Sequence, residues 1–332
     1  MGMFTFVPVW VIQDVIVIIL AVVTVLFIIR KEEHPGPVIL EFICFVFLNA
    51  AVFENFATLM GWYGYGRSVF MLFNVPLSVP ILEYLVVYSS LRILGSMKIR
   101  TWCKPFIVGA FGMLVDLSLD PLAVRQVFET QERTIGRWTW FYDAGAVNIF
   151  RIPVYNFSGW VLLCGYAAAF LLLGRWWYRK SDYSFAVGYL YPVLGMIAAL
   201  GILVTPLSNF LLWLEPFMKK GSAAEWFLAA FYLLFAAVLL AVFWRGRMLR
   251  KLSFTDDVPV FLVFAVSHAS NIVFALIGGY YDILWLQILA AATQTALILL
   301  VYLRGRGLRR RLRNSANSSA HPGSQDNSNC PV

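Results

Sequence analysis

The sequence has little of what soluble proteins and metal sites depend on. Only 13% of its 332 residues are charged, and it contains three histidines and four cysteines. The cysteines are Cys44, Cys103, Cys164 and Cys330, and three of them lie in or beside apolar runs. None has the spacing of a zinc site, so the cysteines indicate neither a metal site nor a disulfide framework.

Two further patterns are missing. The chain shows no alternating segments of about ten residues, which are typical of a transmembrane β-barrel. Its first apolar run has neither a basic segment before it nor a small-residue cleavage site after it, so we expect a span rather than a cleaved signal. Instead, 61% of the residues are hydrophobic, in recurring runs of about eighteen or more. The sequence therefore predicts an all-α, polytopic transmembrane helical bundle.

About nine spans fit the apolar runs, with eight as the alternative. They form one membrane domain over residues 1–313. Residues 314–332 are Ser/Asn-rich without a core pattern, which predicts a disordered polar tail. The predicted spans are 9–30, 37–60, 68–95, 104–122, 157–176, 185–213, 224–244, 258–278 and 282–303.

The distribution of lysine and arginine predicts the orientation of the bundle. With the N-terminus outside, eighteen of these residues flank the inner ends of the spans and seven flank the outer ends. The positive-inside rule then favours N-out, C-in, and we expect a multi-pass protein of the cell membrane. The net charge of +8 lies mainly at span ends, which fits a membrane protein better than a nucleic-acid partner. The sequence indicates no oligomeric state.

The stretch from Gly109 to Trp160 contains the most unusual feature of this apolar chain. The fourth predicted span ends in Asp116 and Asp120, four residues apart and therefore on one helix face. Pro121 disfavours the helical conformation for the residue before it, so the helix is predicted to end at Asp120, at the mouth of a site. A charged side chain inside a membrane costs at least about 2.5–3.5 kcal/mol, so these carboxylates call for a functional explanation.

The predicted topology brings further polar side chains to the same membrane level. Glu54 and Asn55 lie in the outer third of the second span, Asn156 begins the fifth span, and Glu83 lies deeper in the third. Three carboxylates at one level without a cation for each imply that at least one retains its proton, as a general acid must. The four arginines of the outer loop are candidate partners for these carboxylates: Arg125, Arg133, Arg137 and Arg151.

Other polar and aromatic residues allow a structural interpretation. Asp14 and Glu41 are expected at the membrane interfaces, and Arg92 is expected to anchor a span or to form an ion pair. His268 and Asn271 lie three residues apart, which predicts an interhelical hydrogen-bond pair rather than ligands. Three tryptophans form either an interfacial aromatic belt or the wall of a cavity: Trp138, Trp140 and Trp160.

Two other classes of function remain open at this point. A membrane prenyltransferase would bind a Mg²⁺-diphosphate through Asp116 and Asp120, but it needs a second aspartate-rich cluster on the same side. The pair Asp256–Asp257 lies on the predicted inner side. A transporter would be favoured by inverted repeats and broken spans in matching halves, and the sequence shows neither convincingly.

Three motifs in order give a more specific indication: DLSLDPLAV (116–124), GRWTW (136–140) and IPVYNFSGW (152–160). They resemble the signature of the carotenoid-biosynthesis membrane family that contains the carotenoid 1',2'-hydratases, such as the bisanhydrobacterioruberin and γ-carotene hydratases. The upstream runs FENFATLMGWYGYG (53–66) and VPLSVPILEYLVVYSSLRI (75–93) are also similar. One departure is Arg151, which stands before Ile152-Pro153 where a small residue is expected.

The resemblance implies addition of water across the terminal C=C bond of an acyclic carotenoid end, without a metal or redox cofactor. Its partners are then the carotenoid, water and the lipid bilayer. On this hypothesis, Asp116 or Asp120 donates the proton, and Glu54 with Asn55 and Asn156 orients the water. The remaining candidates bind the end group: Glu83, Trp138, Trp140 and Trp160.

Overall fold

The chain forms an all-α bundle, as predicted. The computed structural model describes residues 8–129, 133–205, 221–244, 248–249, 253 and 256–319, and within these ranges nine helices are long and apolar enough to cross a membrane. They are Trp10–Lys31, Pro35–Leu59, Ser78–Gly95, Thr101–Ala123, Val154–Lys180, Phe185–Leu203, Ala224–Phe243, Val258–Ile277 and Tyr281–Leu303. The nine-span prediction is confirmed over the eight-span alternative, while the membrane orientation stays a prediction.

Two spans differ from their predicted form. The third begins at Ser78 rather than at residue 68, because the segment before it turns back on itself as the short strands β2 (Met71–Leu72) and β3 (Val75–Pro76). The second is built from α2 (Pro35–Cys44), a π-helical turn (Phe45–Ala50) and α3 (Ala51–Leu59). The predicted end of the sixth span, residues 206–213, lies outside the described residues.

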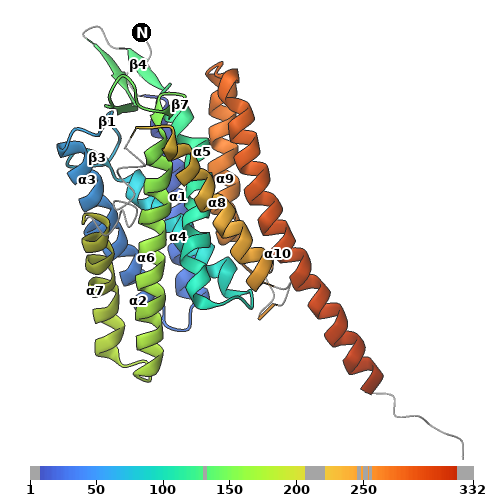
Figure 1. Cartoon of the computed structure of the whole chain (residues 1–332). Helices are drawn as coiled ribbons and strands as arrows, with labels where there is room; N and C mark the ends of the chain where they lie inside the picture. Colours follow the sequence, from blue (N-terminus) through green and yellow to red (C-terminus); the bar gives the residue numbers. More distant parts are fainter. Residues whose placement is uncertain are drawn as a thin grey trace, which may run out of the picture.

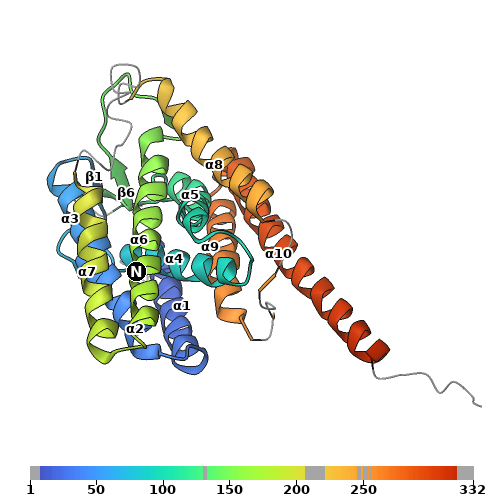
Figure 2. The ribbon, with the colours of Figure 1, turned by 60° about the horizontal axis from the view of Figure 1, so that its bottom comes forward.

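Helices α4 (Ser78–Gly95) and α5 (Lys104–Ala123) form the centre of the bundle. Their spans are 83% and 89% buried, the highest values among the nine. Helices α1 (Trp10–Lys31), α2, α3, α6 (Val154–Lys180) and α7 (Phe185–Leu203) lie to one side of this centre. Helices α8 (Ala224–Phe243), α9 (Val258–Ile277) and α10 (Leu284–Ser319) lie to the other side (Figure 2). Side chains of α5 therefore face protein on all sides.

Helices α5 and α6 pack at very short range because glycines face α6. A Cβ on Gly109 would stand 2.6 Å from the carbonyl oxygen of Val161, and a Cβ on Gly112 would stand 2.7 Å from the sulfur of Cys164. Small residues at such contacts let two helix backbones approach closely, which favours association inside a membrane. This contact fixes α5 against the first turns of α6.

Eight short strands form four two-stranded antiparallel pairs in the described part of the chain, and they gather at one end of the bundle (Figure 1). The pair β1 (Tyr63–Tyr65) and β6 (Trp138–Trp140) joins the loop after α3 to the loop before α6. The other pairs are β4 (Val127–Glu129) with β5 (Thr134–Gly136), β7 (Asn148–Ile149) with β8 (Ile152–Pro153), and β2 with β3. We call this end the strand end; the orientation predicted from charge places it outside.

Partly buried ion pairs connect the helices at the opposite end. Arg92 pairs with Glu32 at 3.1 Å and with Asp257 at 3.4 Å, which confirms its predicted ion-pair role. Glu41 is fully buried rather than interfacial, because Arg175 and the Tyr191 hydroxyl both donate to its carboxylate. A buried carboxylate is tolerated when its oxygens are paired and hydrogen-bonded in this way.

The predicted polar pair of α9 is confirmed as an interhelical link. His268 lies 2.9 Å from the Ser118 hydroxyl on α5 and 2.8 Å from the Gln294 side-chain oxygen on α10. Asn271 donates to the same Ser118 hydroxyl at 3.1 Å. These bonds join three helices on the face of α5 opposite Asp116 and Asp120.

Helix α10 continues past the predicted end of the membrane domain at residue 313, as far as Ser319 (Figure 1). The division at residue 313 into a membrane domain and a polar tail stays a prediction. The segment 314–319 lacks proline and glycine, so nothing in it interrupts the helix that precedes it. Residues 320–332 lie outside the described residues.

The α5–α6 contact leads to a test of packing. Gly109→Ala forces a methyl group against the Val161 carbonyl, and we expect a loss of about 1–3 kcal/mol in the free energy of unfolding, typical of overpacking. Gly95→Ala is the matched control, because no described atom lies within 4 Å of its Cβ position. Thermal unfolding in detergent micelles measures both variants. Equal melting temperatures would contradict the close α5–α6 contact.

Candidate active site

Asp116, Asp120 and Asn156 form the centre of the candidate site. The two aspartates lie one turn apart on α5 and are fully buried, and Asn156 lies in the first turn of α6. The side-chain amide nitrogen of Asn156 donates to Oδ2 of both aspartates, each at 2.7 Å. One neutral amide thus bridges two carboxylates across the short α5–α6 contact.

The prediction that the helix ends at Asp120 is wrong. Helix α5 continues through Pro121 to Ala123, so Asp120 is a helical, buried residue rather than a residue at the mouth of the site. Proline here removes one backbone hydrogen bond near the end of the helix. Burial of Leu119, Leu122 and Ala123 outweighs that loss.

Glu54 faces the same region from α3 and accepts hydrogen bonds from two tyrosines of strand β1. The Tyr63 hydroxyl donates at 2.8 Å, and the Tyr65 hydroxyl donates to the same oxygen. Burial, and after it the charge of Glu54, raises the pKa of both tyrosines well above the usual value. Both phenols therefore stay protonated and act as donors.

The β1–β6 pair explains why four aromatic rings share one face. Side chains alternate across a strand, so Tyr63 and Tyr65 project to the same side, as do Trp138 and Trp140. The register pairs Tyr63 with Trp140 and Tyr65 with Trp138, with ring centroids 4.5 and 4.9 Å apart. The alternation in YGY and WTW is a signal in the sequence that the prediction of helical spans did not use.

These elements enclose a partly open cavity of about 100 Å³ at the strand end of the bundle. Its wall is formed by α3, the β1–β6 pair, α4 and the first turns of α6. It includes six of the nine candidate residues: Glu54, Glu83, Trp138, Trp140, Asn156 and Trp160. Residues that the sequence analysis did not select also line it, namely Phe53, Trp62, Tyr63, Tyr65, Tyr155, Gly159 and Leu163. Asp116 and Asp120 stand directly behind Asn156.

Five buried polar atoms at this site have no hydrogen-bond partner among the described residues. Three are carboxylate oxygens and two are indole N–H groups: Glu83 Oε2, Asp116 Oδ1, Asp120 Oδ1, Trp138 Nε1 and Trp140 Nε1. Buried polar groups in proteins are normally hydrogen-bonded to protein or to water. A water takes about 30 Å³ and needs two to four polar partners, so the cavity suits a few waters or a small branched hydrocarbon group with one water.

Asn55 is not part of this cavity, contrary to the prediction. Its side-chain nitrogen donates to the carbonyl oxygens of Ala51 and Leu72, and its side-chain oxygen accepts from the backbone N–H of Asn74. Glu54 and Asn55 are adjacent on a helix and point about 100° apart, so only one of them faces the bundle interior. Asn55 instead ties α3 to the loop that contains β2 and β3.

The outer-loop arginines do not form ion pairs with the carboxylates of the site, as far as the structure describes the chain. Arg125 pairs with Asp282. Arg137 lies 3.6 Å from Asp14 and donates to the side-chain oxygens of Gln13 and Gln126 at 2.6 and 2.9 Å. Arg137 is still close enough to Asp120 for an electrostatic interaction. The proposed pairing of these arginines with Asp116 and Asp120 is therefore wrong at the level of direct contacts.

Asp14 is buried, contrary to the expected interfacial position. Only 2% of it is exposed, and the hydroxyls of Ser68 and Ser78 donate to its oxygens at 2.5 and 2.7 Å. The Asp14–Arg137 pair therefore connects α1, α4 and the segment just before β6. It holds Trp138 and Trp140 over the cavity.

No group of three or more His, Cys, Asp or Glu side chains within the described residues is arranged to hold a metal ion. The other acidic pair lies at the opposite end of the bundle, where Asp256 pairs with Lys31 and Asp257 with Arg92.

Comparisons of the chain with protein-family models, curated proteins and solved structures gave no match. The fold and the site therefore define the class of the protein as a polytopic membrane helical bundle with a small acidic, aromatic cavity.

The Asp14–Arg137 pair predicts a specific pattern of stability. Arg137→Met leaves Asp14 buried without its cationic partner, which we expect to cost about 3–5 kcal/mol of unfolding free energy. The double variant Asp14→Asn/Arg137→Met should recover much of this loss. Arg125→Met is the control, because its partner Asp282 is largely exposed and an exposed pair contributes about 1 kcal/mol or less.

Thermal and chemical unfolding of the purified variants in detergent measures these differences. Similar losses for Arg137→Met and Arg125→Met, or no recovery in the double variant, would contradict the structural role of the pair.

Proposed function

We propose that the protein hydrates the terminal C=C bond of an acyclic carotenoid end, as a cofactor-independent hydro-lyase. The observation that carries the proposal is the amide bridge from Asn156 to two buried carboxylates beside a small aromatic cavity. The charge distribution supports a location in the cell membrane with the strand end outward.

The first step needs an acid that keeps its proton at neutral pH. Asp116 and Asp120 are close enough to share one amide donor, and none of the four carboxylates at the site forms an ion pair with another described residue. Two carboxylates this close in an apolar surrounding do not both ionise, so the pair holds one proton. Glu83 lines the cavity and interacts electrostatically with Asp120, so it links the pair to the space that the end group would occupy.

The reaction balances without a redox partner. The proton adds to the CH carbon of the terminal (CH3)2C=CH group, and the electron pair of the double bond forms the new C–H bond. The resulting tertiary cation is attacked by the oxygen of a water molecule, and a proton of that water returns to a carboxylate. One water is added, and the acid is regenerated for the next cycle.

The residues that line the cavity suit both the developing cation and the water that attacks it. The aromatic side chains of Tyr63, Trp138 and Trp140 line the cavity, and an aromatic face stabilises a nearby cation by about 0.5–2 kcal/mol. Glu54, held by Tyr63 and Tyr65, is a fixed acceptor for the water. Preorganised groups of this kind stabilise charge without having to reorient during the reaction.

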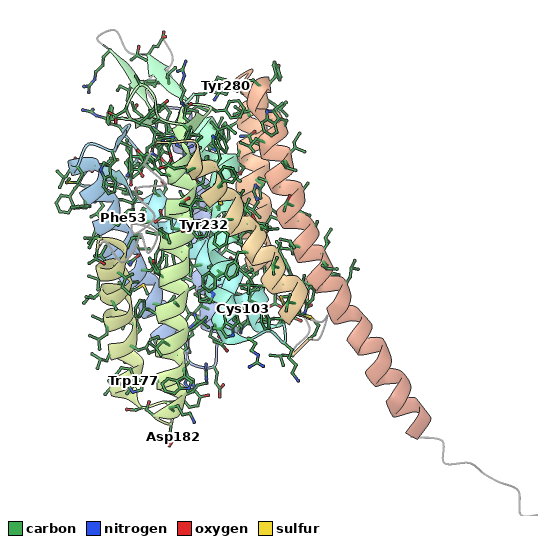
Figure 3. The ribbon with its side chains drawn as sticks, in the orientation of Figure 1. Phe53, Cys103, Trp177, Asp182, Tyr232 and Tyr280 are labelled. Carbon is green, nitrogen blue, oxygen red and sulfur yellow. The ribbon has the colours of Figure 1, made fainter. Side chains whose placement is uncertain are left out.

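The two aspartates give the direct test. Asp116→Asn and Asp120→Asn keep the size of the side chain and remove the acid, and we expect each to lower hydration by about 100-fold or more, the usual effect of a general acid. Asp182→Asn is the matched control, because Asp182 lies on the turn between α6 and α7 at the opposite end of the bundle (Figure 3). The measurement is the mass of the carotenoids formed by the purified variants from an acyclic carotene, where one hydration adds one water.

Full activity in both aspartate variants would show that neither Asp116 nor Asp120 is the acid of the reaction. Consumption of a prenyl diphosphate that stops when Mg²⁺ is chelated would instead favour a membrane prenyltransferase. Unchanged melting temperatures of the variants show that any loss is chemical rather than structural.

A further inference from the structure

The cavity of the candidate site is too small for a whole carotenoid. It measures about 100 Å³, whereas pockets that enclose a drug-sized ligand measure about 300–1,000 Å³. Only the end of a long molecule fits inside it. The rest of the molecule must lie along the surface of the bundle, and the structure should show an apolar path that leads away from the cavity.

Helix α6 carries such a path. The residues Tyr155, Gly159, Leu162, Tyr166, Phe170, Leu173 and Trp177 recur every three or four positions and are all partly or largely exposed. They form one uncharged stripe along the helix. From Tyr155 to Trp177 the stripe is about 33 Å long, close to the 30 Å of a bilayer hydrocarbon core.

The stripe joins two cavities. Its upper end, at Tyr155 and Gly159, lines the candidate site near Phe53, and its lower end contains Trp177 (Figure 3). Around the lower end lies a second, apolar groove of about 350 Å³. Its walls include Phe170, Leu173 and Trp177 of α6 with Leu194, Gly195 and Ala198 of α7.

Gly159 marks the point where the stripe meets the candidate site. It is the only stripe residue without a side chain, and no described atom lies within 4 Å of its Cβ position. Gly159 lines the cavity and is itself partly exposed, so this open space lies where the exposed stripe of α6 reaches the cavity. An apolar chain end can pass there without crossing the strand end of the bundle.

We propose that the polyene chain of the substrate binds along the α6 stripe, with its distal part in the α6–α7 groove, and that its end enters the cavity sideways from the bilayer past Gly159. This inference rests on the proposed function for the identity of the ligand. It specifies that the ligand is a rod about as long as the membrane is thick, and it gives Gly159 and the α6–α7 groove a role in substrate selection.

A labelling experiment tests occupancy of the groove without relying on catalysis. Leu173→Cys, in a Cys330→Ser background, places a thiol at a groove position that is 56% exposed, while the cysteines Cys44, Cys103 and Cys164 are buried. Leu234→Cys on α8 is the matched control, since Leu234 is 66% exposed and lies away from the groove. The rate of alkylation by a lipid-soluble maleimide is measured in vesicles with and without an acyclic carotene.

We expect the carotene, at about twice its Kd, to slow alkylation of Leu173→Cys roughly threefold and to leave Leu234→Cys unchanged. A monoterpene with the same end group should protect neither position, because Leu173 lies about 21 Å along the helix from Gly159. Equal rates with and without carotene, or equal slowing at both positions, would overturn the proposal.

A second variant tests the portal. Gly159→Leu places a side chain in this open space, where its Cβ meets no neighbouring element within 4 Å, and improves helix propensity by about 1 kcal/mol. We expect it to reduce hydration of the full-length carotene at least about tenfold, whereas Gly201→Leu, which also meets no described atom within 4 Å, stays near the wild-type rate. Unchanged activity in Gly159→Leu would overturn lateral access.

The two proposals fail in different ways. If the wild-type protein forms no hydrated product but carotene still protects Leu173→Cys, the binding path stands and the reaction is wrong. If hydration is observed without protection, the reaction stands and the path is wrong.

Discussion

The hydrogen bonds from Asn156 to Asp116 and Asp120 are the constraint on which the rest of the site depends. They form across the interface of α5 and α6, where Gly109 and Gly112 let the two helices pack closely. Once the two helices are fixed, the first turns of α6 also place Trp160, Gly159 and Tyr155 around the cavity. A packing feature of the membrane interior thus determines the geometry of the polar site.

Buried polar groups in different parts of the bundle have different kinds of partner. At the end opposite the strands, Glu41 and Asp257 are matched by Arg175 and Arg92, and on the far face of α5 Ser118, His268 and Asn271 satisfy one another. At the candidate site the carboxylates have only neutral donors: the Asn156 amide and the hydroxyls of Tyr63 and Tyr65. Since neutral donors stabilise a carboxylate less than a cation does, this is where a proton is most readily kept and exchanged.

Much of this arrangement could be predicted from the sequence, because membrane spans have a fixed length and direction. Counting from the span ends was enough to bring Glu54, Asp116, Asp120 and Asn156 to one level, and the structure brings them together. The predictions that failed concern contacts that depend on the rotation of a side chain about its helix axis or on the pairing of loops. Asn55 differs from Glu54 by one position and faces another way, and Arg137 pairs with Asp14, 123 residues away in the chain. Pro121 was predicted to end a helix, but burial of its neighbours outweighs the lost hydrogen bond.

The aromatic residues of the loops at the strand end do more than anchor the protein at the membrane interface. A membrane-interface belt needs rings at the right depth only, and it does not require them to alternate or to pair. Here the alternation in Tyr63–Tyr65 and Trp138–Trp140 and the register between the two strands put all four rings on one face, toward Glu54 and the cavity. The buried indole N–H groups of Trp138 and Trp140 would be a poor choice for a purely apolar wall, because an unsatisfied donor costs about 1–3 kcal/mol. Their presence is consistent with a cavity that receives a polar molecule together with an apolar one, and water beside the end of a hydrocarbon chain is the simplest such pair.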